Sequence, residues 1–411
     1  MKILYVAHRI NMPDGYAVHC RSFVEQVKTL GHDIVTYPPI GPIDYSSVNN
    51  GPAKRRRPMD YLKKINWRTL KRILHRSNGY ISEVLSFLEG LADTYTMKAK
   101  LVATVEQYGI DVIIYRQRLF NFAPFAAARQ TNIPVVFEVN SMRSMEQKLI
   151  VSTGKVTAIT RWAERRSAAS ADAICVVSSA IKQKIESYKT GIPVFVVPNG
   201  VDADMFSPRR YPKEPAKKAL QLSDKLVMGY VGSYKNWHGL DVSLETLALL
   251  VKKDPRWHLL LIGKGPCFPS IANSVRAKGL GSAVTQIEAV PHDRIPEFMA
   301  AFDLALMTYP RLPDFYFSPL KMFEYMAMGI PVVTTNIGQM AEIITGDTGV
   351  LVEHPTPDAF AQAIVEMQPT MEKWGPKARQ LMLESYSWLA NAKRIMAICQ
   401  SVGDGRSEGK N

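Results

Sequence analysis

Two charged side chains, Lys321 and Glu324, interrupt the apolar segment FYFSPLKMFEYMAMGIPVV at residues 315–333. We expect a helix there with Ser318 as N-cap and Pro319 as its first residue, because both residue types favour these positions. A lysine in the first turn opposes the helix dipole unless an anion binds there. Free N–H groups and an ammonium together form a phosphate site. Glu324, one turn further in, could accept hydrogen bonds from two hydroxyl groups.

A purely structural interpretation of the same residues is also open. Lys321 and Glu324 are spaced i, i+3 and could form an ion pair on a buried helix. Apolar residues cover almost the whole circumference of this helix, which predicts burial. Gly329 is the expected C-terminal stop, and a buried strand is expected at 331–335.

The elements that must position these residues alternate along the chain as short β-branched strands and helices, which predicts an α/β protein with doubly wound, Rossmann-like sheets. The length of 411 residues favours two domains, expected at 1–198 and 199–385. A terminal helix at about 386–402 should pack back on the first domain, and the linker is expected around 199–222. The Gly-rich tail 403–411 is expected to be disordered. The expected strands are 2–7, 33–37, 111–115, 134–138, 173–177, 194–197, 226–231, 257–262, 284–287, 303–306, 331–335 and 349–352.

The composition narrows the class of protein. Apolar residues make up 46% of the chain, but no stretch of 18 is apolar throughout, so no membrane span is expected. The N-terminus predicts a first strand and not a signal peptide. The cysteines Cys20, Cys175, Cys267 and Cys399 lack metal spacing and suit a reducing compartment. We therefore expect a cytoplasmic protein without a metal site.

Ligands of open α/β sheets bind at the carboxyl ends of strands, so the loops there are the candidates. The first has a single glycine, Gly15, in place of G-x-G-x-x-G, and no Walker A sequence occurs, which argues against NAD, FAD and a P-loop. Gly15 could still allow a ligand to approach the backbone, or serve as an ordinary turn glycine. Glu138 and Asn140 follow the strand at 134–138, where they are either functional or satisfied locally.

The second half offers two loops that could hold anions. Gly232, Ser233, Lys235 and His238 precede a helix, and Gly263 follows the next strand. Together with the helix after Pro319 they give two anion-binding helix starts, one beside the carboxylate of Glu324. A diphosphate attached to a polyol, such as a nucleotide diphosphate sugar, matches this combination.

The ordered series of segments resembles the family 4 glycosyltransferases, retaining enzymes of the GT-B fold, in which two Rossmann-like domains face each other across a cleft. The resemblance runs over almost the whole chain. The segments that carry it are MKILYVAHR at the start, ADAICVVSSAIKQKI (171–185), VVPNGVDADMFSP (196–208), MGYVGSYKNWHGLD (228–241), LLLIGKGP (259–266) and SPLKMFEYMAMGIPVVTT (318–335).

The resemblance implies roles for individual residues. Glu324 matches the last carboxylate of the family's E-x7-E motif and would bind the ribose hydroxyls of the donor. Tyr316 stands where the first glutamate usually contacts the sugar. Ser233 and His238 stand near positions where the family offers an arginine and a lysine, and Asn140, with Glu138 beside it, near a usual histidine. The diphosphate would be held by helix N-termini with Lys235 and Lys321, and phosphate or sugar by the backbone of Phe317, Ser318, Pro319 and Leu320.

The function implied is a retaining, metal-independent hexosyl transfer, without a cofactor, from a nucleotide diphosphate sugar, with UDP favoured. The acceptor would be a hydroxyl of a glycan, a glycolipid or a lipid-linked molecule. A non-catalytic nucleotide-sugar-binding partner, a sugar-nucleotide epimerase and a glycan phosphorylase of the same architecture remain alternatives.

A basic segment at residues 54–76, from Lys54 to Arg76, carries a net charge of +9 out of +14 for the whole chain. Its apolar residues recur at helical spacing, with Trp67 beside them. This pattern is typical of a helix that lies on an anionic membrane surface, which would suit a lipid-linked acceptor and a peripheral position at the inner face of the membrane. A solvated helix packed on the first domain is the alternative, and no nucleic-acid motif accompanies the charge.

Overall fold

The computed structural model describes residues 1–12, 15–41, 79–150, 158–312 and 314–408. The chain divides into two compact units. The first unit comprises Met1–Pro198 with Asn391–Asn411, and the second comprises Asn199–Ala390. The basic segment 54–76 lies outside the described residues. No helix within the described part is long and apolar enough to cross a membrane.

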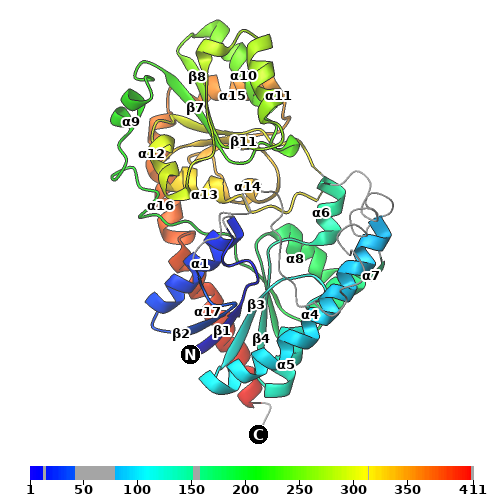
Figure 1. The fold of residues 1–411 in the computed structure, drawn as a ribbon. Helices are drawn as coiled ribbons and strands as arrows, with labels where there is room; N and C mark the ends of the chain where they lie inside the picture. Colours follow the sequence, from blue (N-terminus) through cyan, green and yellow to red (C-terminus); the bar gives the residue numbers. More distant parts are fainter. Residues whose placement is uncertain (13–14, 42–78, 151–157, 313, 409–411) are drawn as a thin grey trace. The chain divides into compact units, whose positions relative to one another are not determined.

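The first unit is built on a six-stranded parallel sheet in the order β2-β1-β3-β4-β5-β6. Figure 1 shows α1 and α17 on one face of this sheet and α4 and α5 on the other. Its strands are β1 (Lys2–Val6), β2 (Asp33–Tyr37), β3 (Val112–Arg116), β4 (Val135–Val139), β5 (Ala173–Val176) and β6 (Val194–Val196). Its helices are α1 (Gly15–Thr29), α4 (Gly79–Tyr108), α5 (Ala123–Thr131), α6 (Arg143–Ile150), α7 (Ala158–Ala168), α8 (Ser179–Glu186) and most of α17 (Trp388–Glu408).

The second unit has its own six-stranded parallel sheet, in the order β12-β11-β10-β7-β8-β9. Its strands are β7 (Leu226–Val231), β8 (Trp257–Ile262), β9 (Val284–Ile287), β10 (Leu304–Met307), β11 (Val332–Thr335) and β12 (Gly349–Val352). Its helices are α9 (Lys213–Ala219), α10 (Leu240–Lys253), α11 (Phe268–Ala277), α12 (Ile295–Met299), α13 (Leu320–Ala327), α14 (Gly338–Ile343), α15 (Pro357–Met367) and α16 (Met371–Ser385), with short 3-10 turns at η2 (Asn236–His238), η3 (Gly281–Ala283) and η4 (His292–Arg294).

The central strands of both sheets are buried on both faces, which confirms the α/β prediction. Every residue of β3, β8 and β11 is buried. Parallel strands covered by helices on each side need such continuous apolar runs. Each of the twelve expected strands is present, with bounds within one residue of those predicted.

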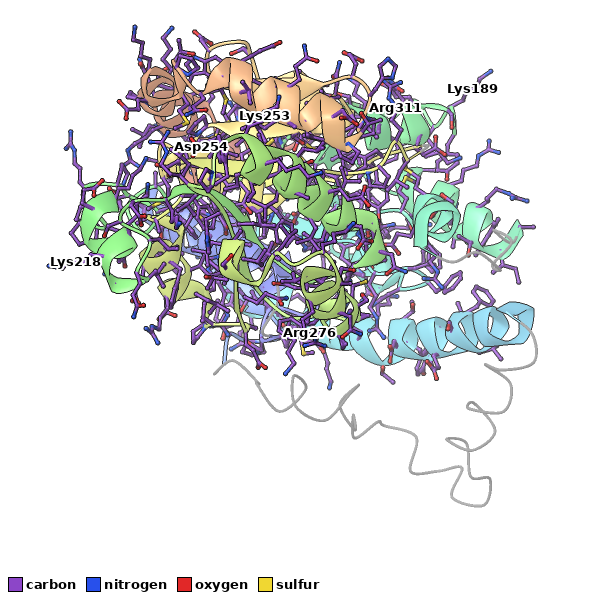
Figure 2. All side chains as sticks on the ribbon, turned by 90° about the horizontal axis from the view of Figure 1, so that it is seen from above. Lys189, Lys218, Lys253, Asp254, Arg276 and Arg311 are labelled. Carbon is purple, nitrogen blue, oxygen red and sulfur yellow. The ribbon has the colours of Figure 1, made fainter. Side chains whose placement is uncertain are left out.

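The stretch 199–222, predicted as a linker, is part of the second unit. Phe206 and Leu222 are buried in the core of that unit. The Lys217 ammonium is also buried and lies 2.6 Å from Asp303 Oδ2, whereas the neighbouring Lys218 projects outward (Figure 2). The polar, Pro-rich composition predicts a linker, but the stretch contains a buried ion pair and three apolar residues of the core, Val201, Phe206 and Leu222.

The helix α17 crosses from the second unit to the first and is longer than predicted. Its residues Ala392, Ile395 and Cys399 belong to the same buried core as Ile3 and Tyr5. The helix continues through Glu408, so residues 403–408 are helical, contrary to the predicted disordered tail. Once a helix is nucleated by packing, adding a glycine such as Gly403 costs only about 1 kcal/mol.

Candidate functional site

The helix α13 starts one residue later than predicted and has no capping side chain. Pro319 is its N-cap, with no side-chain hydrogen bond to the first turn, so the prediction that Ser318 caps the helix is wrong. The Ser318 hydroxyl instead accepts a hydrogen bond from the Asn199 backbone N–H at 3.1 Å, and the Ser318 carbonyl accepts one from Asn199 Nδ2 at 2.7 Å. The N–H of Met322 is bonded to the Pro319 carbonyl at 3.0 Å. Among the described residues, the N–H groups of Leu320 and Lys321 are therefore left for another partner.

Lys321, now the second helical residue, extends from this uncapped end to the loop after β7. Its Nζ donates to the Tyr230 hydroxyl at 2.9 Å and lies 4.1 Å from the centre of the Tyr230 ring. Burial lowers the pKa of Lys321 to about 7, against the opposing effect of Glu324. A lysine with this pKa can gain a full charge when an anion arrives.

The loop after β7 is folded around the same tyrosine. The Tyr230 hydroxyl lies 2.7 Å from His238 Nδ1 and 3.0 Å from the Ser233 carbonyl, and His238 Nδ1 also contacts that carbonyl. Burial, with Lys321 nearby, lowers the pKa of His238 to about 2. His238 is therefore neutral at pH 7, and Lys321 supplies the cationic group of this cluster.

Glycines bring the backbone of two loops together beside Lys321. Gly232 and Gly263 have φ values of 141° and 140°, which favour glycine. A Cβ on Gly232 would lie 2.6 Å from Lys321 Nζ, and one on Gly263 would lie 2.0 Å from the Gly232 carbonyl oxygen. Any side chain at either position would fill the space next to the ammonium or push the loops apart.

Glu324 lies one turn along α13 and is 7% exposed. Its Oε1 lies 2.8 Å from His292 Nε2, and the His292 ring packs on Phe206 at 5.5 Å between centroids. Burial lowers the pKa of His292, but the bond to Glu324 outweighs it, so the pKa is raised. Because Lys321 and Glu324 are engaged by Tyr230 and His292, the alternative interpretation of an i, i+3 ion pair does not explain their presence.

Aromatic rings surround the approach to α13. Tyr316 is 2% exposed and stacks on Phe317 with 4.4 Å between ring centroids. The Phe315 ring lies between those of Phe317 and Tyr309, with 5.1 Å between ring centroids in each pair. Leu320 is half-buried as the first residue of α13, and Lys235 Nζ lies 4.8 Å from the centre of the Trp237 ring. The position expected to contact a sugar is therefore a buried ring.

The remaining predicted site residues, Gly15, Glu138 and Asn140, belong to the first unit. Gly15 is exposed and is the first residue of α1. Asn140 follows β4, and its Oδ1 is buried without a hydrogen-bond partner in the described structure. Asn140 thus keeps an acceptor that a ligand could use.

Glu138 is placed as a structural anchor rather than as a group that could reach a substrate. It is 4% exposed, and its oxygens accept hydrogen bonds from the Tyr5 hydroxyl at 2.9 Å and from Arg116, with His19 Nε2 at 2.8 Å. Burial alone would raise the pKa of Glu138, but Arg116 and His19 lower it to about 2. The predicted catalytic role of Glu138 therefore conflicts with its surroundings, since its base strength is low and its oxygens are occupied.

Sequence reasoning missed Tyr230, His292 and Asn199. Tyr230 lies near the carboxyl end of β7, and His292 lies in the loop after β9, so the rule that ligands bind at strand ends could have identified both. Asn199 gave no local signal, because its partner Ser318 lies 119 positions away. Within the described residues, no group of three or more His, Cys, Asp or Glu side chains could hold a metal ion.

Comparisons with known proteins match both units. The family model described as Glycosyltransferase Family 4 matches residues 13–205, and the one described as Glycosyl transferases group 1 matches residues 225–368. The chain is similar to the alpha-D-kanosaminyltransferase of Streptomyces kanamyceticus, with 24% identity over 292 residues, which are 69% of this chain and 74% of that protein.

Solved structures show the same fold. A sucrose-phosphate synthase from Thermosynechococcus elongatus aligns with a TM-score of 0.70 and 17% identity, over 98% of this chain and 100% of that one. Anabaena Alr3699/HepE in complex with UDP-glucose aligns with a TM-score of 0.66 and 17% identity, over 98% and 100% of the two chains.

Proposed function

Because the chain belongs to the family 4 glycosyltransferases and is an enzyme of the GT-B fold that uses a nucleotide-sugar donor, we propose that its donor is a UDP-sugar held at the start of α13. The observation that carries this proposal is the uncapped N-terminus of α13 with Lys321 beside it. Helix N–H groups and an ammonium bind phosphate oxygens. The choice of uridine draws on the structural neighbour solved with UDP-glucose.

Glu324 binds the ribose of the donor in this proposal. His292 occupies Oε1 and leaves Oε2 to accept hydrogen bonds from two vicinal hydroxyls. The bond to His292 also fixes the orientation of the carboxylate, because the His292 ring is packed on Phe206. A carboxylate held in advance loses little side-chain entropy when the ligand binds.

The glycosidic bond to the diphosphate breaks as the acceptor oxygen bonds to the same face of the anomeric carbon, so the configuration is retained. The proton of the acceptor hydroxyl passes to a leaving diphosphate oxygen. Glu138 does not act as the base, since its oxygens are occupied. The negative charge that develops on the diphosphate is stabilised by Lys321, Lys235 and the amides at the start of α13, without a metal ion. Electrostatic stabilisation of this kind is usually the largest catalytic contribution.

The acceptor is a hydroxyl of a glycan, glycolipid or lipid-linked saccharide in this proposal. The two alternatives of the same architecture can be distinguished from a transferase. An epimerase makes no new glycosidic bond, and a glycan phosphorylase needs pyridoxal phosphate. The non-catalytic alternative draws its support from Tyr316, which is buried where the family usually has a glutamate.

The test combines binding with turnover. The protein is titrated with UDP-glucose, UDP-N-acetylglucosamine, GDP-mannose and ADP-glucose by thermal shift, since a ligand of the folded state raises the melting temperature. The best donor is then incubated with saccharide and lipid-linked acceptors, with and without EDTA, and the anomer of the product is determined by NMR. We expect a UDP-sugar to stabilise, EDTA to have no effect and the anomer to be retained. Stabilisation by GDP-mannose alone, loss of activity with EDTA or an inverted product would each contradict the corresponding part of the proposal.

A further inference from the structure

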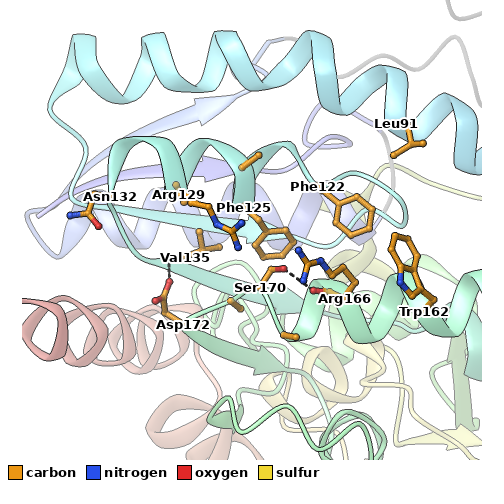
Figure 3. Close-up of a pocket in the computed structure, with 14 residues that line it drawn as sticks. Leu91, Phe122, Phe125, Arg129, Asn132, Val135, Trp162, Arg166, Ser170 and Asp172 are labelled. Atoms are coloured by element: carbon orange, nitrogen blue, oxygen red, sulfur yellow. Dashed lines mark hydrogen bonds between the residues drawn. The ribbon is translucent and has the colours of Figure 1, made fainter. Parts of the chain in front are cut away.

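The first unit contains a groove that lies outside the proposed donor site. It is a groove of about 440 Å³ between α5 and α7, next to α4. Figure 3 shows Phe122 and Phe125 entering it from the segment of α5, and Trp162 and Arg166 from α7. Every lining residue belongs to the first unit.

One end of the groove is aromatic and unusually exposed. Trp162 is 52% exposed, although tryptophan is highly buried on average. Its ring lies 5.9 Å from that of Phe122 and 6.0 Å from that of Phe87, measured between centroids. Three large rings thus form an apolar surface that is open to solvent.

The apolar surface continues onto α4. Leu88, Leu91 and Tyr95 are 55%, 40% and 87% exposed, and their spacing of i, i+3 and i+7 places them in one stripe of the helix. Leu91 also lines the groove, so the stripe and the groove are continuous. Contiguous exposed apolar surface of this kind marks a site of interaction with another molecule.

Two arginines extend into the middle of the groove. Figure 3 shows Arg129, from the last turn of α5, and Arg166, from α7, reaching toward the ring of Phe125. Both arginines are exposed, and neither forms an ion pair with a carboxylate in the ranges that the structure describes. The lining carboxylate, Asp172, is engaged by the Val135 backbone N–H at 2.8 Å.

The other carboxylate close to Arg166 in sequence, that of Glu164, does not line the groove. Glu164 is buried, and its oxygens accept hydrogen bonds from the Ser144 backbone N–H at 3.0 Å and from the Tyr188 hydroxyl at 2.7 Å. The guanidinium groups therefore keep their charge available for a ligand. Positive charge beside the exposed apolar surface of the groove is complementary to a molecule that joins an anionic head group to a hydrocarbon chain.

We propose that this groove binds an anionic phospholipid of a membrane surface. The phosphate lies between Arg129 and Arg166, whose planar guanidiniums suit phosphate oxygens. The acyl chain lies along Phe122, Trp162 and Leu91. A nucleic acid would need a track of cations beside stacking rings, whereas the surface next to this groove is the apolar stripe of α4. The proposal does not depend on the donor site.

The test uses the intact protein and vesicles of equimolar phosphatidylglycerol and phosphatidylcholine, with brominated acyl chains that quench tryptophan at close range. The chain has six tryptophans, so the contribution of Trp162 is the difference between the wild type and W162F. The variant R129A/R166A removes the two cations, and R129K/R166K keeps their charge. The variant K252A/K253A removes the same charge from exposed lysines of α10.

We expect quenching in the wild type that W162F partly loses, and no quenching with vesicles of phosphatidylcholine alone. Two cations near an anionic surface contribute roughly a 30-fold change in partitioning, so R129A/R166A should bind about that much more weakly. R129K/R166K should keep most of the charge contribution but bind more weakly than the wild type, because lysine lacks the planar guanidinium. K252A/K253A should bind like the wild type.

Three results would overturn the proposal. One is quenching that W162F leaves unchanged, because the contact would then lie elsewhere. The second is an equal loss in R129A/R166A and K252A/K253A, which would indicate nonspecific attraction. The third is displacement from vesicles by inorganic phosphate as effective as that by lysophosphatidylglycerol, which would indicate a simple anion site.

Discussion

Replacing Lys321 with methionine should weaken donor binding and stabilise the protein at the same time. Methionine has nearly the shape of lysine but no charge. In the free protein the ammonium is held against Tyr230 at 2.9 Å, in a place where burial lowers the pKa of Lys321 to about 7. A lowered lysine pKa means that folding carries a penalty for the charged form.

The magnitudes follow from these contacts. The pKa falls from 10.5 to about 7, and at about 1.4 kcal/mol per unit this sets an upper bound of about 5 kcal/mol on the penalty. We expect K321M to gain about 1–2 kcal/mol, which raises the melting temperature of a unit of this size by about 3 °C or more. A lost charge-assisted hydrogen bond of about 1.5–3 kcal/mol weakens donor binding roughly 10- to 150-fold.

The pH dependence gives an independent check. The penalty is fully present below the folded-state pKa of about 7 and disappears as the pH rises toward the unfolded-state value. The advantage of K321M in melting temperature should therefore shrink between pH 7 and pH 10. Binding of UDP-glucose to the wild type at pH 8 should be accompanied by proton uptake, because the lowered pKa leaves much of the free lysine neutral at that pH.

The assay is thermal unfolding across this pH range, with calorimetric titration of UDP-glucose in buffers of different ionisation enthalpy. K252M, which removes an exposed lysine of α10, is the matched control and should change neither property. A lower melting temperature for K321M at pH 7, combined with unchanged affinity, would refute the reasoning, because Lys321 would then be a structural residue.

Three further variants test the surroundings of the site. H292A should weaken UDP binding about tenfold, because Glu324 loses the partner that orients it. In a calorimetric pH series the difference from the wild type should shrink as the pH rises through the raised pKa of His292, because the wild type then loses the charge on His292. A loss of affinity that does not depend on pH would contradict a role for this charge. E138Q should destabilise the protein by about 3 kcal/mol, because Arg116 stays buried beside a weaker partner, and calorimetry should show unchanged UDP affinity; a stable variant with lost binding would reverse our placement of Glu138. Y316E should lower the melting temperature by several degrees because it buries a carboxylate, and an unchanged melting temperature would show that this position is open to solvent.

The fold could be predicted from local sequence because parallel strands buried on both faces must be apolar throughout. Segments such as 257–262 and 332–335 can therefore be predicted as strands from their own residues, without knowledge of the strands that pair with them. The stretch 199–222 falls in the expected second domain, but its packing into the core of that unit differs from the expected linker for the opposite reason. Its place in the second unit depends on the bond from Lys217 to Asp303, which lies 86 positions away.

The site could be predicted in part, since Lys321 and Glu324 are anomalous in an apolar helix. Their partners could not, because Tyr230 and His292 reach them from other strand ends, 91 and 32 positions away. The sequence leaves the role of Glu138 open between a functional and a locally satisfied carboxylate, because its partners Tyr5 and Arg116 come from β1 and β3, far away along the chain. Such pairings are decided by the order of strands, which a single sequence does not specify.

The most direct test of the central claim asks whether Glu324 contacts the donor's ribose. The affinities of UDP and 2′,3′-dideoxy-UDP are measured by calorimetry for the wild type and for E324A, whose fold is checked by its melting temperature. We predict that the wild type prefers UDP by about tenfold or more, as expected for hydrogen bonds to a charged group, and that E324A binds both nucleotides equally. If E324A keeps the full preference for UDP, the ribose does not lie at Glu324 and the proposed donor site is wrong.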